Sequence, residues 1–108
     1  MCNTRVLCQH TRTTVSQCSD CGMFFIWHNN MLLSFLDKEY HLFLSYIKRY
    51  VFSERSVIFP DGEDRIIIHS SAKELSLAFE EDEWEEFKEA LTEAAYLGNV
   101  YDILKGKN

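Results

Sequence analysis

Hydrophobic and polar residues along this chain form two successive stretches of strand-like pattern. Each stretch contains three short segments rich in β-branched or aromatic residues, and short turn sequences separate the segments. The asparagines after His28 and the sequence Pro60-Asp61-Gly62 are typical of such turns. The predicted strands cover residues 13–17, 23–28, 31–35, 56–59, 65–69 and 75–79.

A helical pattern follows each group of three strands. The apolar stripe of the first helix consists of Tyr40, Phe43, Leu44, Ile47 and Val51, and that of the second consists of Trp84, Phe87, Leu91 and Ala95. Residues three or four apart lie on the same face of a helix, so each stripe predicts one buried face. We expect Asp37 to cap the first helix at its N-terminus and Gly98 to end the second, with residues 100–104 forming a further turn.

The two stretches align with each other, which predicts a duplicated strand-strand-strand-helix unit. At one fixed offset Leu33, Phe35, Glu39, Tyr40, Phe43 and Ile47 align with Leu77, Phe79, Glu83, Trp84, Phe87 and Leu91. The first unit spans about residues 11–52 and the second about 56–97, followed by a short segment, 98–108. The predicted fold is one α+β domain over residues 1–108, in which two helices cover an antiparallel sheet. Chance similarity between α+β segments is the alternative.

The composition supports a single folded domain outside the membrane. The 108 residues are 46% hydrophobic, which is enough to form a core. The longest apolar region, residues 23–35, is interrupted by His28 and two asparagines, so it does not predict a membrane span. Residues 1–14 lack the continuous apolar segment of a signal peptide, and we therefore expect a cytoplasmic protein.

The N-terminal cysteines predict one structural zinc ion per chain. Cys18 and Cys21 are separated by two residues and followed by Gly22, which is the usual sequence of a metal-binding turn. In an extended segment Cys8 and His10 lie on the same side, because side chains alternate along a strand. The predicted ligands are therefore Cys8, His10, Cys18 and Cys21, a set that suits tetrahedral Zn²⁺ and leaves no position for a substrate.

Other interpretations of the cysteines remain open. Cys2 could replace His10 and give four sulfur ligands. A redox-active Cys-X-X-Cys motif usually requires a helix N-terminus, whereas a β-turn is expected here. The cysteines could also be ordinary buried residues. Disulfides are less favoured because cytoplasmic thiols stay reduced.

The charge of the chain is concentrated on the second predicted helix. Residues 80–93 contain eight acidic residues and one lysine, a local charge of −7, while the whole chain carries −6. We interpret the carboxylates as a solvent-facing surface that does not hold paired catalytic groups. The leading hypothesis is a non-enzymatic, zinc-stapled interaction or adaptor domain whose acidic helix docks on a basic protein surface.

Two alternative functions belong to other classes. A nucleic-acid-associated zinc protein would need a basic patch near the cysteine turn, with Arg5, Arg12, Lys48, Arg49 and Arg55 as its candidates. The sequence pI of about 5.1 argues against nucleic acid as a partner. A metal or thiol redox enzyme would need an open metal or an activated thiol, and no motif places a catalytic partner beside His28, His41 or His69. We expect no membrane partner, and unpaired outer strands could join two copies into a homodimer.

A set of short motifs gives the chain a resemblance to other proteins. These motifs are Cys18-Ser19-Asp20-Cys21, Trp27-His28-Asn29, Leu32-Leu33-Ser34-Phe35 and Glu39. Through these motifs, the first half of the chain resembles small uncharacterised bacterial proteins, mostly from Bacteroidetes. Those proteins share a cysteine-pair turn before an aromatic strand, a short hairpin and a helix. The resemblance implies a metal-binding turn and no particular activity.

Overall fold

The structure, a computed structural model, describes residues 3–104 and 106. Its elements are β1 (Thr4–Gln9), β2 (Thr13–Cys18), β3 (Phe24–His28), β4 (Met31–Phe35), α1 (Asp37–Lys48), α2 (Phe52–Arg55), β5 (Val57–Ile58), β6 (Asp64–His69), β7 (Ser76–Phe79) and α3 (Glu81–Leu104). The α+β class with antiparallel strands and covering helices is thereby confirmed. Within the described residues, no helix is long and apolar enough to cross a membrane.

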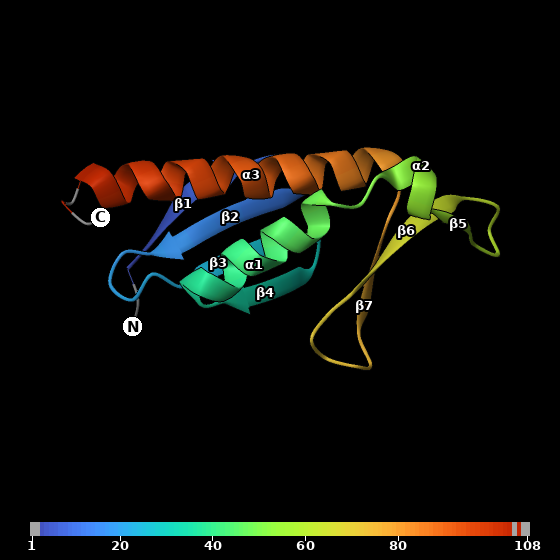
Figure 1. Cartoon of the computed structure of the whole chain (residues 1–108), viewed down its shortest axis with the longest axis horizontal. Helices are drawn as coiled ribbons and strands as arrows, with labels where there is room; N and C mark the ends of the chain where they lie inside the picture. The colour runs from blue at the N-terminus through green and yellow to red at the C-terminus, as the bar shows by residue number, and fades with distance from the viewer. Residues whose placement is uncertain (1–2, 105, 107–108) are drawn as a thin grey trace.

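The strands form two antiparallel sheets, whereas the sequence predicted one. β1, β2, β3 and β4 pair in chain order in one sheet, and β5, β6 and β7 pair in chain order in the other. Figure 1 shows the two sheets toward opposite ends of the molecule, with α3 running along both. Because α3 has 24 residues, it is about 36 Å long at 1.5 Å per residue. One helix is therefore long enough to hold the two sheets together.

The first helix begins one residue earlier than the capping prediction placed it. Leu36 is the N-cap, with extended backbone angles, and Asp37 is the first helical residue. The Leu36 N–H donates to Glu39 Oε1 at 2.9 Å, so the glutamate supplies the side-chain acceptor that was expected from Asp37. Asp37 still places a negative charge in the first turn, where the helix dipole favours it.

Gly98 does not end the second helix. It is a buried residue inside α3, which continues to Leu104. A Cβ atom at Gly98 would lie 3.4 Å from both Gln17 Oε1 and Phe24 Cζ. The glycine therefore allows α3 to approach β2 and β3 closely, a use of glycine that is independent of helix termination.

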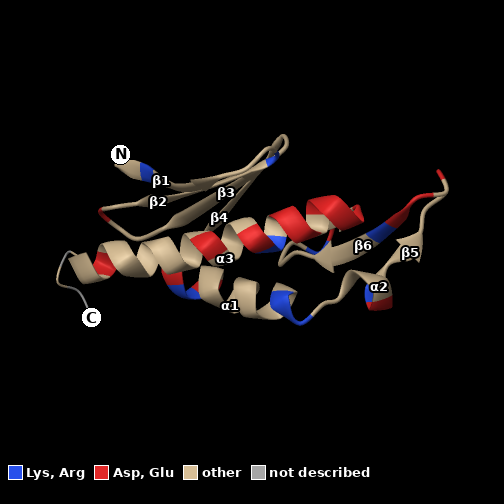
Figure 2. Cartoon of the chain, turned by 90° about the horizontal axis from the view of Figure 1, so that it is seen from above, with Lys and Arg blue, Asp and Glu red and all other residues tan. Residues whose placement is uncertain are grey.

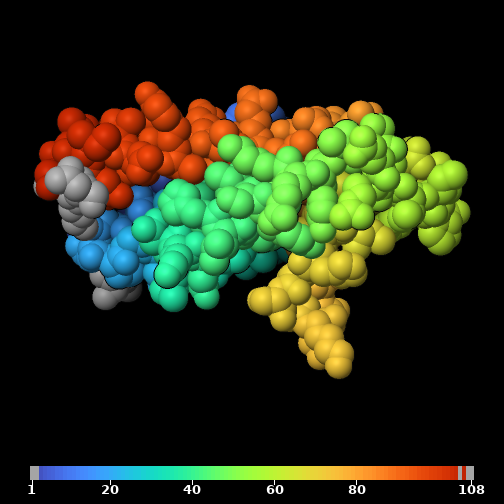
Figure 3. All heavy atoms as spheres, in the orientation of Figure 1, coloured from blue at the N-terminus to red at the C-terminus, as the bar shows by residue number. Residues whose placement is uncertain are grey.

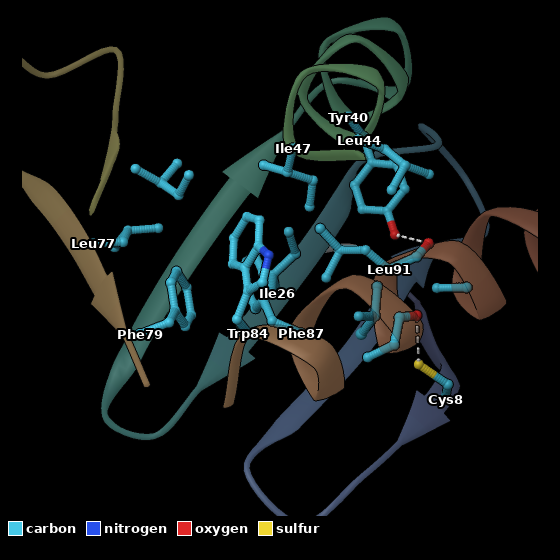
Figure 4. Close-up of a cluster of buried hydrophobic side chains, with 14 of the residues drawn as sticks. Cys8, Ile26, Tyr40, Leu44, Ile47, Leu77, Phe79, Trp84, Phe87 and Leu91 are labelled. Carbon is cyan, nitrogen blue, oxygen red and sulfur yellow. Dashed lines mark hydrogen bonds between the residues drawn. The ribbon is translucent and has the colours of Figure 1, made fainter. Parts of the chain in front are cut away.

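The core lies where α3, α1 and the sheets meet (Figure 4). Trp84, Phe87 and Leu91 of α3 are fully buried, as the helical stripe predicted. Tyr40 of α1 is also fully buried; its ring stacks on Phe24 with 3.9 Å between ring centroids, and its hydroxyl donates to the Leu91 carbonyl at 2.7 Å. Burial raises the pKa of Tyr40 well above its usual value, so the phenol is neutral and holds α1 to α3.

The two predicted units share element order and several local contacts. β2-β3-β4-α1 is followed by β5-β6-β7-α3, and Phe35 pairs with Phe24 as Phe79 pairs with Ile66. Glu83 Oε1 accepts the Glu80 N–H at 3.3 Å at the start of α3, as Glu39 does for α1. The helices differ in length, and Phe35 is half-buried whereas Phe79 is buried. The duplication remains a prediction that superposition of the units tests.

Candidate metal centre

A β-bulge in β1 places Cys8 against α3. Val6 pairs with Ser16, but the next pairing joins Cys8 to Val15, so the register shifts at Leu7. Leu7 and Cys8 are consecutive and both buried. A bulge inserts one residue into a strand and interrupts the alternation of its side chains. Cys8 consequently faces the side of the sheet that α3 covers.

The Cys8 thiol is protonated and hydrogen-bonded to α3. Its Sγ donates to the Ala90 carbonyl at 3.1 Å (Figure 4). Burial raises the pKa of Cys8 to about 11; the negative charge of Glu93 adds to this rise, and a backbone hydrogen bond from Val15 opposes it. Without a bound cation, Cys8 is therefore neither a nucleophile nor a redox-active thiol at neutral pH.

His10 and Glu93 complete a group of three donors beside Cys8. His10 Nε2 lies 2.9 Å from Glu93 Oε1, and the two side chains are 25% and 46% exposed. Sulfur, nitrogen and oxygen donors of Cys8, His10 and Glu93 all lie within 4.8 Å of one another. Donors around a tetrahedral zinc are separated by roughly 3.3–3.8 Å, given metal–ligand distances near 2.0–2.3 Å. Small side-chain movements would thus bring these three groups onto one metal ion.

The predicted cysteine turn forms between β2 and β3. Gly22 has the expected positive φ of 80°, and its N–H donates to the Cys18 carbonyl at 3.0 Å. The Cys21 N–H points to Cys18 Sγ at 3.5 Å. Cys18 is buried and Cys21 is exposed. This backbone turn has the form that the sequence indicated for a pair of cysteines.

The structure does not bring the four predicted ligands together. Cys8 pairs with Val15, whereas Cys18 pairs with Thr4. Cys18 lies three residues beyond Val15 on β2, roughly 10 Å away at 3.3 Å per residue. Cys8 and His10 are therefore at one end of the β1–β2 hairpin, and the Cys18–Cys21 turn is at the other. The alternative ligand Cys2 lies outside the described residues.

The turn between β1 and β2 is clamped to the acidic helix by Arg12. Its backbone N–H donates to Glu86 Oε2 at 2.7 Å, and its guanidinium lies 3.4 Å from Glu86 and 3.3 Å from Asp82. The hydrogen bond from Arg12 holds the pKa of Asp82 below its usual value. Since His10 contacts Glu93 on the same helix, both ends of this turn are attached to α3.

A second polar connection joins β2, β3 and α3. Thr13 Oγ1 lies 2.8 Å from His28 Nδ1, and His28 Nε2 lies 3.1 Å from Glu83 Oε2. A hydroxyl, an imidazole and a carboxylate in this order resemble a catalytic triad. However, Thr13 is fully buried, and a nucleophile must be accessible to its substrate. The three residues therefore form a structural hydrogen-bond network.

The acidic helix is only partly solvent-facing, which corrects the sequence interpretation. The side chains of Glu83 and Glu86 are 17% and 14% exposed and contact the first sheet, whereas Glu81, Glu85 and Glu89 are exposed. Figure 2 shows that most acidic residues of α3, coloured red on the ribbon, lie in its N-terminal half. Glu83 and Glu86 each precede a residue of the apolar stripe and so lie at the edge of the buried face. That position is the sequence signal that could have identified them.

The arginines do not form the basic patch that a nucleic-acid interface near the cysteine turn would need. Arg5 packs over the ring of Tyr101 with 4.1 Å to its centroid, and Arg12 is paired with carboxylates. Arg49 and Arg55 line a separate cleft beside α1 and α2. Lys48 lies in a cleft with several glutamates. Cationic groups are thus distributed over different surfaces.

These features define an α+β domain with a candidate metal centre between a bulged strand and a long helix. A family model described as a family of unknown function (DUF6686) matches residues 1–106, so the chain belongs to this family. Membership agrees with the predicted similarity to uncharacterised proteins. No curated protein and no solved structure matches the chain.

Proposed function

We propose that the chain is a non-enzymatic interaction domain in which one structural zinc ion joins β1 to α3. The observation that supports this most directly is the convergence of Cys8, His10 and Glu93 within 4.8 Å. Thiolate, imidazole and carboxylate are all zinc ligands, and thiolate and imidazole favour zinc over Mg²⁺ or Ca²⁺. A structural role fits the position of the group, because Cys8 is buried in the contact between the strand and the helix.

The energetics of the group permit metal binding at neutral pH. Because the pKa of Cys8 is about 11, removing its proton at pH 7 requires about 5 kcal/mol. Four-ligand zinc-finger sites bind Zn²⁺ with an apparent free energy of roughly 10–16 kcal/mol at pH 7, which is larger than this cost. A cation would also reverse the effect of Glu93, which disfavours the thiolate only while no positive charge lies between them. Water would occupy the fourth position, since His10 and Glu93 are partly exposed. The structural role proposed for the zinc therefore rests on the burial of Cys8 against Ala90 of α3, since three protein ligands do not close the coordination sphere.

Measurement of bound zinc in matched variants tests this ligand set. The wild-type protein, purified without chelator and without a metal-binding tag, should contain one zinc ion per chain. Cys8→Ser and Glu93→Gln should each lower zinc affinity by at least about tenfold. Loss of a residue that only hydrogen-bonds to a metal ligand already has an effect of this size, and loss of a ligand should not have a smaller one. Cys18→Ser and Cys21→Ser are the matched controls and should retain the metal. The reverse result would reject the Cys8–His10–Glu93 site in favour of the cysteine turn.

The proposed interaction surface is the outer face of α3, formed by Glu81, Glu85 and Glu89. These three glutamates lie four residues apart and are exposed, so they can meet a basic protein surface without loss of the contacts between α3 and the first sheet. The sheet edges offer a separate route to a homodimer, because β1 and β4 are the outer strands of the four-stranded sheet.

Binding of a fluorescent lysine-rich peptide, measured by anisotropy at two salt concentrations, tests the acidic surface. Reversal of Glu81, Glu85 and Glu89 to lysine should abolish binding. The matched control reverses three exposed glutamates outside α3, Glu54, Glu63 and Glu74, and therefore changes the net charge equally. Equal loss of binding in both triple variants would show that only net charge matters, and would refute an interface on α3.

A further inference from the structure

A groove on another face of the molecule runs between α1, α2 and the β6–β7 hairpin. Three adjoining clefts of about 580, 140 and 210 Å³ share Tyr46 in their walls. We refer to them together as the Tyr46 groove. Figure 3 shows a hollow between α1 and the projecting β6–β7 hairpin, and residues of these elements line the 210 Å³ cleft. None of the predicted metal ligands lines it.

One end of the Tyr46 groove is cationic. The 580 Å³ cleft is lined by Tyr46, Arg49, Tyr50, Glu54 and Arg55. Within residues 3–104, Arg12 and Arg65 form ion pairs with carboxylates, whereas Arg49 and Arg55 form none. The Arg49 Nε donates to the Ser45 carbonyl at 3.4 Å, and the Arg55 guanidinium lies 4.2 Å from the centroid of the Tyr50 ring.

The arrangement of side chains at this cationic end favours binding of an oxyanion. A guanidinium that stacks on an aromatic ring is held in place yet keeps N–H groups for a carboxylate or phosphate. The Tyr46 and Tyr50 rings are 5.0 Å apart, and a side-chain hydrogen bond between the two residues is the main cause of a raised pKa for Tyr46. Phenol hydroxyl groups can donate to an anion, so the two tyrosines add donors to this end of the groove.

The other end of the Tyr46 groove is apolar. The 210 Å³ cleft is lined by Leu33, Phe35, Phe43 and Leu77 together with small serines of β4 and the β6–β7 turn. Its volume holds about seven groups of the size of a water molecule, each near 30 Å³. The intermediate cleft, lined by Ile67 and His69 beside Tyr46, connects the two ends.

We propose that the Tyr46 groove binds a small amphipathic anion, with a carboxylate or phosphate head at Arg49 and Arg55 and a short aliphatic tail in the apolar cleft. Charge complementarity selects the head, because two guanidinium groups face one carboxylate, Glu54, in an otherwise acidic protein. The tail must cross the 140 Å³ intermediate cleft and fill the 210 Å³ apolar cleft, which together hold roughly twelve groups of 30 Å³, so the groove selects a single chain of about twelve carbons over a membrane lipid or a polymer. The site does not depend on metal binding.

Isothermal titration calorimetry of the metal-free protein with n-alkyl carboxylates of about four to sixteen carbons tests the proposal. Affinity should rise about fourfold per methylene while the tail fills the two clefts, and then level off near about twelve carbons. Octyl phosphate distinguishes a phosphate head from octanoate, and octanol measures the contribution of the tail alone. Anionic phospholipid vesicles should not compete for the site.

Three variants link binding to the groove. Arg49→Gln and Arg55→Gln should each weaken octanoate binding by at least about tenfold, the loss expected for a charge-assisted hydrogen bond, and should leave octanol unaffected. Lys38→Gln removes one exposed charge at the opposite end of α1 and should leave both ligands unaffected. The proposal is overturned if octanoate does not bind at millimolar concentration, if octanol binds equally well, or if Lys38→Gln weakens binding as much as the arginine variants.

Discussion

The two kinds of glutamate on α3 should respond differently to removal. Glu86 is 14% exposed and accepts a 2.7 Å hydrogen bond from the Arg12 backbone, beside the Arg12 guanidinium. Its neighbour Glu85 is 60% exposed and has a single 3.7 Å contact with Lys88. Both are in the same helix turn, so alanine at either position has the same effect on helix propensity. The comparison therefore isolates the contact with the β1–β2 turn.

The expected magnitudes follow from these contacts. Hydrogen bonds to charged groups contribute about 1.5–3 kcal/mol, and Glu86→Ala leaves the Arg12 N–H without its acceptor. A loss near 2 kcal/mol lowers the melting temperature of a domain of this size by about 8–12 °C. Exposed ion pairs contribute about 0–1 kcal/mol, so Glu85→Ala should lower it by at most a few degrees.

Thermal unfolding followed by far-ultraviolet circular dichroism at pH 7 measures the difference. A double-mutant cycle with Arg12→Ala, which keeps the backbone N–H, should give a coupling free energy of up to about 1 kcal/mol for Glu86 from the guanidinium contact alone, and close to zero for Glu85. If Glu86→Ala and Glu85→Ala melt within 2 °C of each other, the β1–β2 turn is not held by Glu86 and the assignment of inner and outer carboxylates is wrong.

Three further changes test other parts of the structure. In the metal-free protein the pKa of Cys8 is raised from 9.0 in the unfolded chain to about 11. The buried neutral thiol therefore contributes about 2–3 kcal/mol to the free energy of unfolding, and this contribution is fully present below pH 9. Urea unfolding should show that it disappears between pH 9 and pH 11. Cys8→Ala should not show that part of the alkaline loss, and an identical pH profile would contradict the burial of the thiol. Gly98→Leu should destabilise the protein by about 1–3 kcal/mol, because the leucine side chain would overlap Phe24 and Gln17, whereas Gly98→Ala should be nearly neutral. Equal stability of the two variants would show that α3 does not approach β2 closely. Trp84→Ala should cost about 3–5 kcal/mol in chemical unfolding, and a loss under 1 kcal/mol would mean that this fully buried ring does not lie in the core.

The core elements could be predicted because their signals are local. The periodic spacing of Tyr40, Trp84, Phe87 and Leu91 identifies the buried helix faces without knowledge of the fold. Likewise, the Cys18–Gly22 turn follows from the residues within it. The sequence prediction for Gly98 was wrong because glycine is common both at helix ends and where a helix packs closely against another element. Only the contact with Phe24, which is distant in the chain, shows that Gly98 has the second role.

The candidate metal centre could be predicted only in part because it depends on long-range contacts. The two-residue spacing of Cys8 and His10 correctly places both toward one side, where they meet α3. Their third partner, Glu93, is 83 residues from His10 in the chain and reaches it through the docking of α3. The separation of Cys18 from Cys8 follows from hairpin geometry, because residues equally distant from the turn face each other. Recognising that this extended segment pairs with β2 through a turn at residues 10–12 would have been enough to separate them.

The bulge at Leu7 has a consequence for comparing members of the family. Without the extra residue in β1, the alternation that turns Arg5 inward would turn Cys8 outward, away from Ala90 and Glu93. A relative that lost or gained one residue in this strand could keep both the cysteine and the histidine, yet present them on the opposite face of the sheet. Aligned columns would then look intact, although the three donors of the candidate metal centre would no longer meet. The spacing between Cys8 and the paired segment of β2 is therefore a better marker of the site than the identity of its ligands.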